Sequence, residues 1–197
     1  MRPELLTVIY GCMFAEKTKR LIEHHRPDGT TVAFKPDIDA DRYQSGAMLA
    51  SKDPKFPRVP AILVPVDNVS VIWQEVARMD EVTRVLIDEA NFFPTKEFIE
   101  LIELLTSRSI EVVVAGLTHF ASKEPWGPLP ELLKIPGVQV KHVFAECDGK
   151  GRKCPKPAIW SYQKFPHDKV LVDGESAYGA TCDEHYSVLH QGERYDE

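Results

Sequence analysis

The sequence predicts an α/β fold, in which a mostly parallel β-sheet carries helices on both faces and a small module follows it. Short apolar runs alternate along the chain with segments whose apolar residues recur every three or four positions, an order typical of parallel sheets. From Cys147 onward the composition shifts to Gly, Lys, Pro and Cys. We therefore expect a main domain over residues 1–145 and a smaller one over residues 146–197.

Apolar runs and the turn signals between them place the elements of the main domain. Strands are expected over residues 5–10, 31–34, 61–64, 84–89, 110–115 and 138–145. Helices are expected over residues 16–25, 69–79, 95–107 and 129–133; in the second, for example, Val69, Ile72 and Val76 share one face. Prolines at positions 36, 54, 57 and 60 argue against regular structure over residues 35–60.

Composition limits the classes of function. The chain has 197 residues, of which 43% are hydrophobic, and a net charge of −6, so its surface as a whole lacks the basic footprint of a nucleic-acid-binding protein. No apolar stretch approaches the roughly 18 residues of a membrane span, and the start of the chain leads directly into a strand without a signal-peptide core. We expect a cytoplasmic protein that does not bind membranes and is unlikely to bind nucleic acid.

The loop over residues 11–18 lies between the first strand and the first helix. Its spacing is that of a phosphate-binding loop, except that Glu16 stands where the second glycine is expected. In such a loop, backbone N–H groups surround phosphate oxygens, a lysine (here Lys17) adds positive charge and a hydroxyl (here Thr18) ligates magnesium. An ordinary strand-to-helix turn would have the same outline, so the motif alone leaves both interpretations open.

Two carboxylates, Asp88 and Glu89, end the apolar run over residues 84–89. The carboxyl end of a buried parallel strand delivers such groups into a crevice. In phosphoryl-transfer sites the first acid holds the water shell of the metal and the next accepts the proton of the nucleophile. The alternative is that both acids cap the helix that begins near Thr95; Lys17 and Thr18 upstream favour the functional interpretation.

An aromatic loop follows the strand over residues 110–115. It contains Phe120 and Trp126, and aromatic side chains in such loops often stack on a base or another ring. Burial against neighbouring helices is the alternative. The sequence leaves the choice between these two roles open.

Cysteines cluster in the last quarter of the chain. Three thiols and an imidazole make a set suited to a closed tetrahedral zinc site, namely Cys147, Cys154, Cys182 and His185. The second pair has good Cys-x-x-His spacing, whereas six residues separate the first two cysteines. His167 and His190 are spare ligand candidates, and free thiols are the alternative to zinc.

The order of these motifs resembles the zinc-containing, type II thymidine kinases over nearly the whole chain. The resemblance rests on Gly-x-Met-Phe-x-x-Lys-Thr, Asp-Arg-Tyr, Ile-Asp-Glu-Ala-Asn-Phe-Phe, Pro-Trp-Gly-Pro-Leu-Pro-Glu-Leu-Leu, Cys-Pro-Lys-Pro-Ala and Asp-Gly-Glu-Ser-Ala-Tyr ahead of Cys-Asp-Glu-His. Two departures from the family pattern are Glu16, in place of glycine, and Asp183, in place of arginine.

The resemblance implies a P-loop (RecA-like) kinase domain followed by a zinc-binding lasso domain, with ATP, Mg²⁺ and a structural Zn²⁺. The implied reaction transfers a phosphoryl group from ATP to the 5′-hydroxyl of thymidine or a closely related pyrimidine deoxynucleoside. A homo-oligomer, by analogy a tetramer, and inhibition by a nucleotide product are implied as well. The alternative is a kinase-like binding protein that transfers phosphate weakly because of Glu16.

Roles for individual residues follow from the same resemblance. Lys17 would hold the β and γ phosphates, Thr18 would ligate magnesium, Asp88 would hold the metal through water, and Glu89 would accept the proton of the 5′-hydroxyl. Arg42 would neutralise charge on the transferring group. The remaining phosphate-loop residues are Gly11, Cys12, Met13, Phe14, Ala15 and Glu16. The walls of the nucleoside pocket would be Met13, Phe92, Leu117, Phe120 and Trp126, with Ser161 near the base C5 position and Tyr178 closing over the base from the lasso, residues 159–178.

Overall fold

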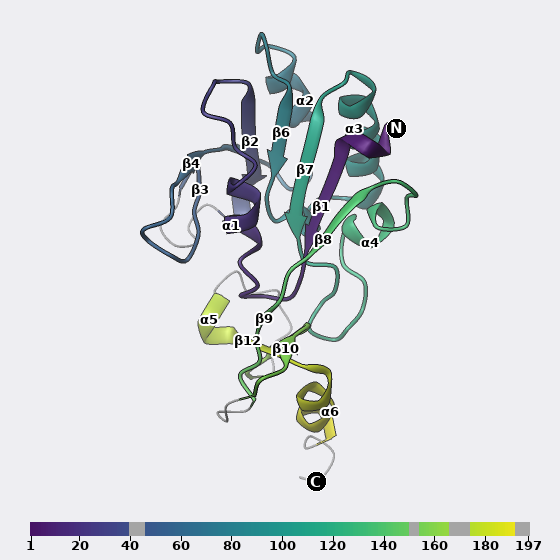
Figure 1. Cartoon of the computed structure of the whole chain (residues 1–197). Coiled ribbons are helices and arrows are strands. Elements are labelled where there is room, and N and C mark those ends of the chain that lie inside the picture. Colours follow the sequence, from purple (N-terminus) through teal and green to yellow (C-terminus); the bar gives the residue numbers. More distant parts are fainter. Residues whose placement is uncertain (40–45, 150–153, 166–173, 192–197) are drawn as a thin grey trace.

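A six-stranded parallel sheet, with strand order β5-β2-β6-β7-β1-β8, forms the centre of the molecule (Figure 1). The structure is a computed structural model, and it describes residues 1–39, 46–149, 154–165 and 174–191. The six strands are β1 (Leu6–Tyr10), β2 (Thr31–Pro36), β5 (Ile62–Val64), β6 (Arg84–Ile87), β7 (Glu111–Gly116) and β8 (Gln139–His142). The predicted α/β fold with a parallel sheet is confirmed.

Helices cover both faces of the sheet, as predicted (Figure 1). The main-domain helices are α1 (Lys17–Ile22), α2 (Ser70–Val76), α3 (Thr95–Ser107) and α4 (Leu129–Leu132), with short 3-10 turns at Pro3–Leu5, Asp37–Asp39 and Ala90–Phe92. Successive strand residues point to opposite faces: Val112 and Val114 pack in the core beneath α2, α3 and α4, whereas Val113 packs in the core beneath α1. The residues that read as continuous apolar runs are therefore buried on both sides.

Helix α3 begins and ends where its sequence pattern predicts. Phe98, Ile102 and Leu105 are fully buried on one face, and burial of each such side chain stabilises the fold by roughly 1.5–3 kcal/mol. The helix ends at Ser107, and Ser109 adopts a left-handed φ of 62°. Tertiary burial and local periodicity agree here, so the prediction succeeds.

Several predicted elements differ from the structure. The helix predicted over residues 69–79 ends at Val76, and the strand predicted over residues 84–89 ends at Ile87. The strand predicted over residues 138–145 is wrong in its second half: β8 ends at His142, and Ala145 pairs with Ala158 in a separate sheet. The Val143 N–H still donates to the Tyr10 carbonyl over 2.8 Å, and the chain then leaves the sheet. The first helix, predicted over residues 16–25, spans only Lys17–Ile22. Residues 35–60, where prolines argued against regular structure, contain an antiparallel pair of short strands, β3 (Met48–Leu49) and β4 (Val59–Pro60).

The C-terminal part is built from short antiparallel pairs beyond the carboxyl ends of the main strands (Figure 1). Its elements are β9 (Ala145–Glu146), β10 (Pro157–Ala158), β11 (Trp160–Gln163), α5 (Gly174–Ala177), β12 (Tyr178–Thr181) and α6 (Asp183–Gln191). Alanines and cysteines of this part form one buried cluster with Cys12 and Ala15 of the loop after β1. The boundary between residues 145 and 146 stays a prediction. Among the described residues, no helix combines the length and the apolar character needed to cross a bilayer.

Candidate active site and metal centre

Residues that follow three of the strands meet at the carboxyl edge of the sheet. The loop over residues 11–16 follows β1, Asp88 and Glu89 follow β6, and Leu117 follows β7. Parallel strands place all of their carboxyl ends at one edge, where ligands of open α/β sheets bind. The topology thus brings the two sequence motifs together.

The phosphate loop has the backbone of a strained, specialised turn. A Cβ at Gly11 would lie 2.1 Å from the Val143 carbonyl oxygen, so only glycine fits there. Phe14 and Glu16 adopt left-handed φ angles of 66° and 56°, a conformation that costs a non-glycine residue about 1–3 kcal/mol. The position of Glu16 is therefore one where glycine is the unstrained choice.

The Glu16 side chain is exposed and contacts a lysine of α1. Its Oε2 lies 3.5 Å from Lys19 Nζ, and half of the side chain is exposed. Glu16 also lines the larger cavity described below. The carboxylate thus has a partner on α1 and room to remain outside the centre of the loop.

Lys17 and Thr18 lie at the start of α1, as their motif requires. Lys17 is buried, and its Nζ donates to the Cys12 carbonyl oxygen over 2.8 Å. The Thr18 hydroxyl donates to Asp88 Oδ2 over 2.7 Å. This hydrogen bond joins the loop after β1 to the acids after β6, which are 70 positions apart in the chain.

Asp88 has a strongly perturbed pKa. Burial raises the pKa of this carboxyl from 3.8 to about 7, and the negative charges of Glu89 and Asp39 act in the same direction, while hydrogen bonds from Thr18 and the Glu89 N–H oppose them. Such a group is a site at which a cation would be favourable, because the cation would offset both the desolvation and the like charges.

A consequence for stability can be measured. The folded chain binds a proton at Asp88 more tightly than the unfolded chain does. The contribution of Asp88 to the free energy of unfolding therefore falls as pH rises from about 4 to about 7. Relative to Asp88→Asn, the parent's free energy of unfolding should fall by about 2–3 kcal/mol between pH 5 and pH 8 without added magnesium. Urea denaturation measures it. Asp28, an exposed residue whose pKa is lowered, is the control: Asp28→Asn keeps Asp88, so its free energy of unfolding should fall in parallel with the parent's between pH 5 and pH 8. Parallel curves for the parent and Asp88→Asn would contradict the assignment.

Glu89 lies in the wall of a cavity of about 850 Å³ that Lys17, Thr18 and Tyr178 also line. It is buried, and its φ of 45° is left-handed. Its N–H donates to Asp88 Oδ1 over 3.0 Å. A buried carboxylate in strained backbone beside a phosphate loop has the placement expected of an acid that acts on a substrate.

The aromatic residues of the predicted nucleoside pocket pack on one another. Trp126 stacks on Phe120 with ring centroids 4.5 Å apart, and it meets Phe92 edge-on at 5.0 Å. The Leu117 N–H donates to Asn91 Oδ1 over 2.9 Å, which ties this loop to the turn after Glu89. Mutual packing and a role in a pocket are both compatible with this arrangement, since all three rings are half-buried.

Ser161 joins the C-terminal part to the phosphate loop. Its Oγ accepts a hydrogen bond from the Met13 N–H over 2.9 Å. Leu117, Phe120 and Ser161 line a second, smaller cavity of about 150 Å³, which also borders Gly11. The predicted pocket residues are therefore divided: Tyr178 lines the larger cavity and these three line the smaller one.

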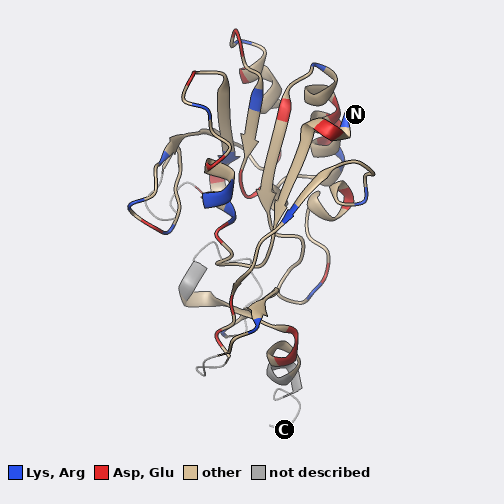
Figure 2. Ribbon diagram, viewed as in Figure 1, with Lys and Arg blue, Asp and Glu red and all other residues tan. Residues whose placement is uncertain are grey.

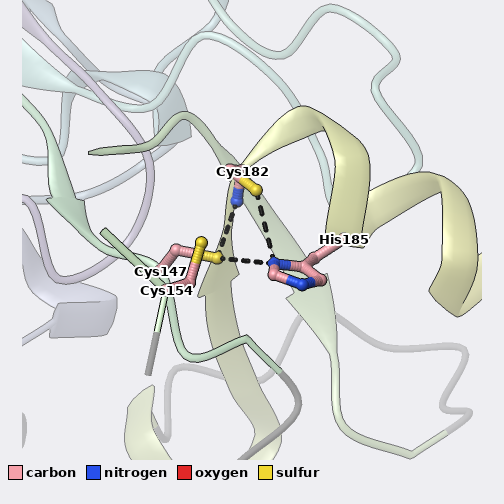
Figure 3. Close-up of side chains that lie close together, drawn as sticks. All are labelled: Cys147, Cys154, Cys182 and His185. Carbon is pink, nitrogen blue, oxygen red and sulfur yellow. Dashed lines mark hydrogen bonds between the residues drawn. The ribbon is translucent and has the colours of Figure 1, made fainter. Parts of the chain in front are cut away.

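The four predicted metal ligands converge (Figure 3). Their ligand atoms, from Cys147, Cys154, Cys182 and His185, all lie within 4.8 Å of one another. His185 Nδ1 is 3.3 Å from Cys147 Sγ and 3.4 Å from Cys182 Sγ. A tetrahedral Zn²⁺ with bonds of about 2.0–2.3 Å holds its ligand atoms roughly 3.5–3.8 Å apart, so the donor set and its spacing fit zinc.

The Cys147 thiol is held in a state suited to binding a metal. Burial acts to raise its pKa, but hydrogen bonds from the Cys182 N–H and from His185 outweigh burial and lower the pKa to about 6. A thiolate is the form that ligates zinc. Cys12, by contrast, is buried with a raised pKa and donates to the Ala158 carbonyl, so it is a packing residue of the loop.

Sequence reasoning missed some groups of the site. Asp39 and Lys35 are both buried, with Asp39 Oδ2 3.2 Å from Lys35 Nζ, and the charge of Asp39 acts on Asp88. The signal was available, because Asp39 follows the second strand at the same edge of the sheet. Asn91 was also missed as the anchor of Leu117. Arg42, assigned to charge neutralisation, lies outside the described residues.

Charge is mixed over the molecule. Acidic and basic residues intersperse on the face shown in Figure 2, while α1 carries Lys17, Lys19 and Arg20 next to the phosphate loop. Local positive charge therefore accompanies the candidate phosphate site, within a chain whose net charge is −6. This pattern fits a small anionic ligand better than a nucleic-acid backbone.

The fold and the site define a P-loop α/β protein, with a Cys₃His cluster in its C-terminal part. The family model "Thymidine kinase" matches residues 4–186. A thymidine kinase of Coprothermobacter proteolyticus is 31% identical over 189 residues, which cover 93% of this chain and 90% of the relative. A thymidine kinase of Bacteroides thetaiotaomicron is 31% identical, with 92% and 86% covered, and one of Porphyromonas gingivalis is 30% identical, with 90% and 82% covered. The chain belongs to the thymidine kinase family.

Proposed function

We propose that this protein transfers the γ-phosphoryl group of ATP to the 5′-hydroxyl of thymidine or a closely related pyrimidine deoxynucleoside. The observation that carries the proposal is that Lys17, Thr18 and Glu89 line one cavity and that Asp88 accepts a hydrogen bond from Thr18, in a chain that belongs to the thymidine kinase family. Family membership over nearly the whole length favours a kinase over a binding protein that has lost phosphoryl transfer.

The loop binds the phosphate donor. Successive backbone N–H groups and the start of α1 face the phosphate oxygens, and the Lys17 ammonium exchanges its contact with the Cys12 carbonyl for the β and γ phosphates. Mg²⁺ would be held by the Thr18 hydroxyl and, through water, by Asp88, where it would supply positive charge against the phosphates. Hydroxyl and carboxylate oxygens are the ligands this ion prefers, so the residues fit it.

Glu89 serves as the base. Its carboxylate accepts the proton of the nucleoside 5′-hydroxyl as that oxygen attacks the γ-phosphorus, and the bond from that phosphorus to the bridging oxygen of ADP breaks. Tyr178, buried and in the wall of the same cavity, closes over the nucleoside. Phe120, Leu117 and Ser161 contact the pyrimidine from the smaller cavity, and Arg42 neutralises charge on the transferring group.

Zinc has a structural role in this proposal. The Cys₃His cluster holds β12 and α6 beside β9, and through Ser161 this part contacts the phosphate loop. A closed four-ligand set leaves no position for substrate. Assembly into a homo-oligomer and inhibition by a nucleotide remain predictions from the family resemblance.

A direct assay tests the activity. Purified protein with ATP and Mg²⁺ should convert thymidine to its 5′-monophosphate, with one ADP formed per thymidine consumed. Chromatographic separation of both products measures this ratio. Thymidine and ATP binding without conversion would support the kinase-like binding protein instead, and DNA-stimulated ATP hydrolysis without a nucleoside product would support a nucleic-acid ATPase.

Restoring glycine at position 16 should tighten ATP binding by about tenfold. The gain comes from removing a carboxylate near the phosphates, because the strain of the left-handed backbone is already present without ATP and therefore cancels from the ATP affinity. Full repulsion at about 4 Å would amount to roughly 4 kcal/mol at an effective dielectric of 20, but the contact of Glu16 with Lys19 keeps the charge farther out, so a smaller gain is expected. ATP titration calorimetry on Glu16→Gly measures it.

A second glutamate provides the matched control for this substitution. Exposed Glu81 also has a left-handed φ, of 71°, and no described contact with the phosphate loop, so Glu81→Gly removes the same side chain from the same kind of backbone. It should leave ATP affinity within about twofold of the parent, since the effect of charge is local at ordinary ionic strength. Equal ATP affinity in the parent and Glu16→Gly would show that the charge of Glu16 does not affect the phosphates.

A further inference from the structure

Residues 118–126 form a hairpin that carries two of the pocket aromatics. The Trp126 N–H donates to the Thr118 carbonyl and the Phe120 N–H to the Glu124 carbonyl, both over 2.9 Å. Lys123 lies at its turn with a left-handed φ of 68°. A lysine in this conformation is uncommon, and such backbone persists when its surroundings fix it.

Three residues of the C-terminal part, Trp160, Asp183 and Tyr186, fix the Lys123 side chain; we call these three and Lys123 the clasp. The Lys123 ammonium lies 4.3 Å from the centroid of the Trp160 ring and 4.0 Å from that of Tyr186. It also lies 3.1 Å from Asp183 Oδ1. The same oxygen accepts a hydrogen bond from Trp160 Nε1 over 2.8 Å, so one cation joins two rings and a carboxylate.

Two further contacts support the clasp. Tyr186 donates its hydroxyl to the Ala121 carbonyl over 2.6 Å, and Trp160 meets the His119 ring edge-on at 5.5 Å. Isolated exposed ion pairs contribute little, but here the ammonium also lies over two aromatic rings, one of them buried. Cation–π contacts of this kind add to the pairing and gain strength where water is excluded.

Strand β11 connects the clasp to the pocket. Trp160 and Ser161 are neighbours on this strand, and neighbouring side chains point to opposite faces: Trp160 faces Lys123, while Ser161 accepts from the Met13 N–H. Phe120 of the hairpin and Ser161 of β11 line the same cavity of about 150 Å³. The distance between its two walls depends on how hairpin and strand are held together.

We propose that Lys123 is a positioning residue for the nucleoside: through the clasp it holds the hairpin against β11, so that Phe120 and Ser161 face one another across the base site. This inference rests on the proposed function, because it assigns that cavity to the pyrimidine. Asp183, which stands where the family pattern has arginine, is the partner that this lysine requires.

Lys123→Met should raise the KM for thymidine by about tenfold, the effect of losing a cation held between rings and a carboxylate, and should leave kcat and the KM for ATP within about twofold. Lys123→Arg should recover most of the affinity, because a guanidinium can keep both the ring contacts and the carboxylate contact. Lys156→Met is the matched control: Lys156 pairs with Glu184 on the same helix α6 but has no described contact with the hairpin. Lys156→Met should have the same KM for thymidine as the parent.

Hydrogen exchange tests whether the clasp exists in the absence of a nucleoside. In Lys123→Met, peptides covering residues 118–126 and 160–163 should exchange about tenfold faster than in the parent, whereas Lys156→Met should leave the hairpin unchanged. Unchanged exchange, an unchanged thymidine KM, a fall in kcat alone, or failure of Lys123→Arg to recover would each overturn the proposal. If the parent neither binds nor phosphorylates thymidine, the proposed function fails, and the exchange result still decides whether the clasp exists.

Discussion

Glu89→Gln should lower kcat for thymidine phosphorylation by about 10² to 10⁴-fold, the usual contribution of a general base. The amide keeps the size of the carboxylate but cannot accept the proton of the 5′-hydroxyl. Thymidine affinity should stay within about twofold, because the wall of the cavity keeps its shape. Single-turnover kinetics and thymidine calorimetry together measure the two quantities.

Glu146 provides a matched control for this prediction. It lines the same cavity but is exposed, so Glu146→Gln removes an equal charge from the site without removing the base, and its kcat should stay within about twofold of the parent. Glu89→Gln should in addition lower the pKa of Asp88, since the charge of Glu89 helps to raise it. Turnover of Glu89→Gln within a few-fold of the parent would make Glu89 structural and place the base elsewhere.

The backbone strain at Glu89 is the same in the parent and in Glu89→Gln. Its φ of 45° is left-handed, and glutamine meets the same strain there as glutamate. The substitution should therefore change the free energy of unfolding little compared with its effect on kcat. A large loss of stability in Glu89→Gln would point to a structural role, and urea denaturation separates the two effects.

Local pattern was sufficient to predict the elements of the main domain whose burial follows from their own sequence. Helix α3 has its apolar residues at helical spacing, and its two ends agree with the structure. The buried strands β6 and β7 read as short apolar runs because helices cover both of their faces. Asp88 was identifiable for the same reason, since its position follows from the end of a strand.

Contacts that form only in the tertiary structure could not be predicted from the local sequence pattern. The chain leaves the sheet after Val143 because it passes Gly11 and then pairs with residues of the C-terminal part, and nothing local in residues 138–145 signals that departure. Lys123 likewise reads as an ordinary loop lysine, and only the fold brings it to Trp160 and Asp183.

The metal centre was partly predictable. Cys182 and His185 have local spacing that indicates a metal pair, whereas Cys147 and Cys154 are separated by six residues and gave a weaker signal. The structure brings all four together because β9 pairs with β10, so that Cys147 and Cys154 lie in the connection between paired strands, and because the Cys182 N–H donates to Cys147 Sγ over 3.2 Å. Strand pairing, which sequence spacing does not reveal, completes the ligand set.

Cys182→Ala should abolish stoichiometric zinc binding and, with it, the ordered C-terminal part. The parent should contain one zinc per chain, and the variant less than about one tenth of an equivalent, because loss of one of four ligands removes a large share of the apparent 10–16 kcal/mol that structural zinc supplies. The buried cluster around the site consists of small residues, so apart from the buried rings of Tyr178 and Tyr186 little apolar burial remains to hold β12 and α6 without the metal.

Cys12 supplies the matched control for the zinc prediction. Cys12 and Cys182 are each 4% exposed and belong to the same buried cluster, but Cys12 donates to the Ala158 carbonyl and is outside the ligand set. Cys12→Ala should keep one zinc per chain, whereas Cys182→Ala should lose both zinc and the slow hydrogen exchange of β11 and β12. Metal analysis with exchange measurements tests this. The prediction would be wrong if Cys182→Ala retained full zinc, or if it lost zinc without any change in exchange over residues 160–163 and 178–181. Either result would show that the cluster does not hold this part of the fold.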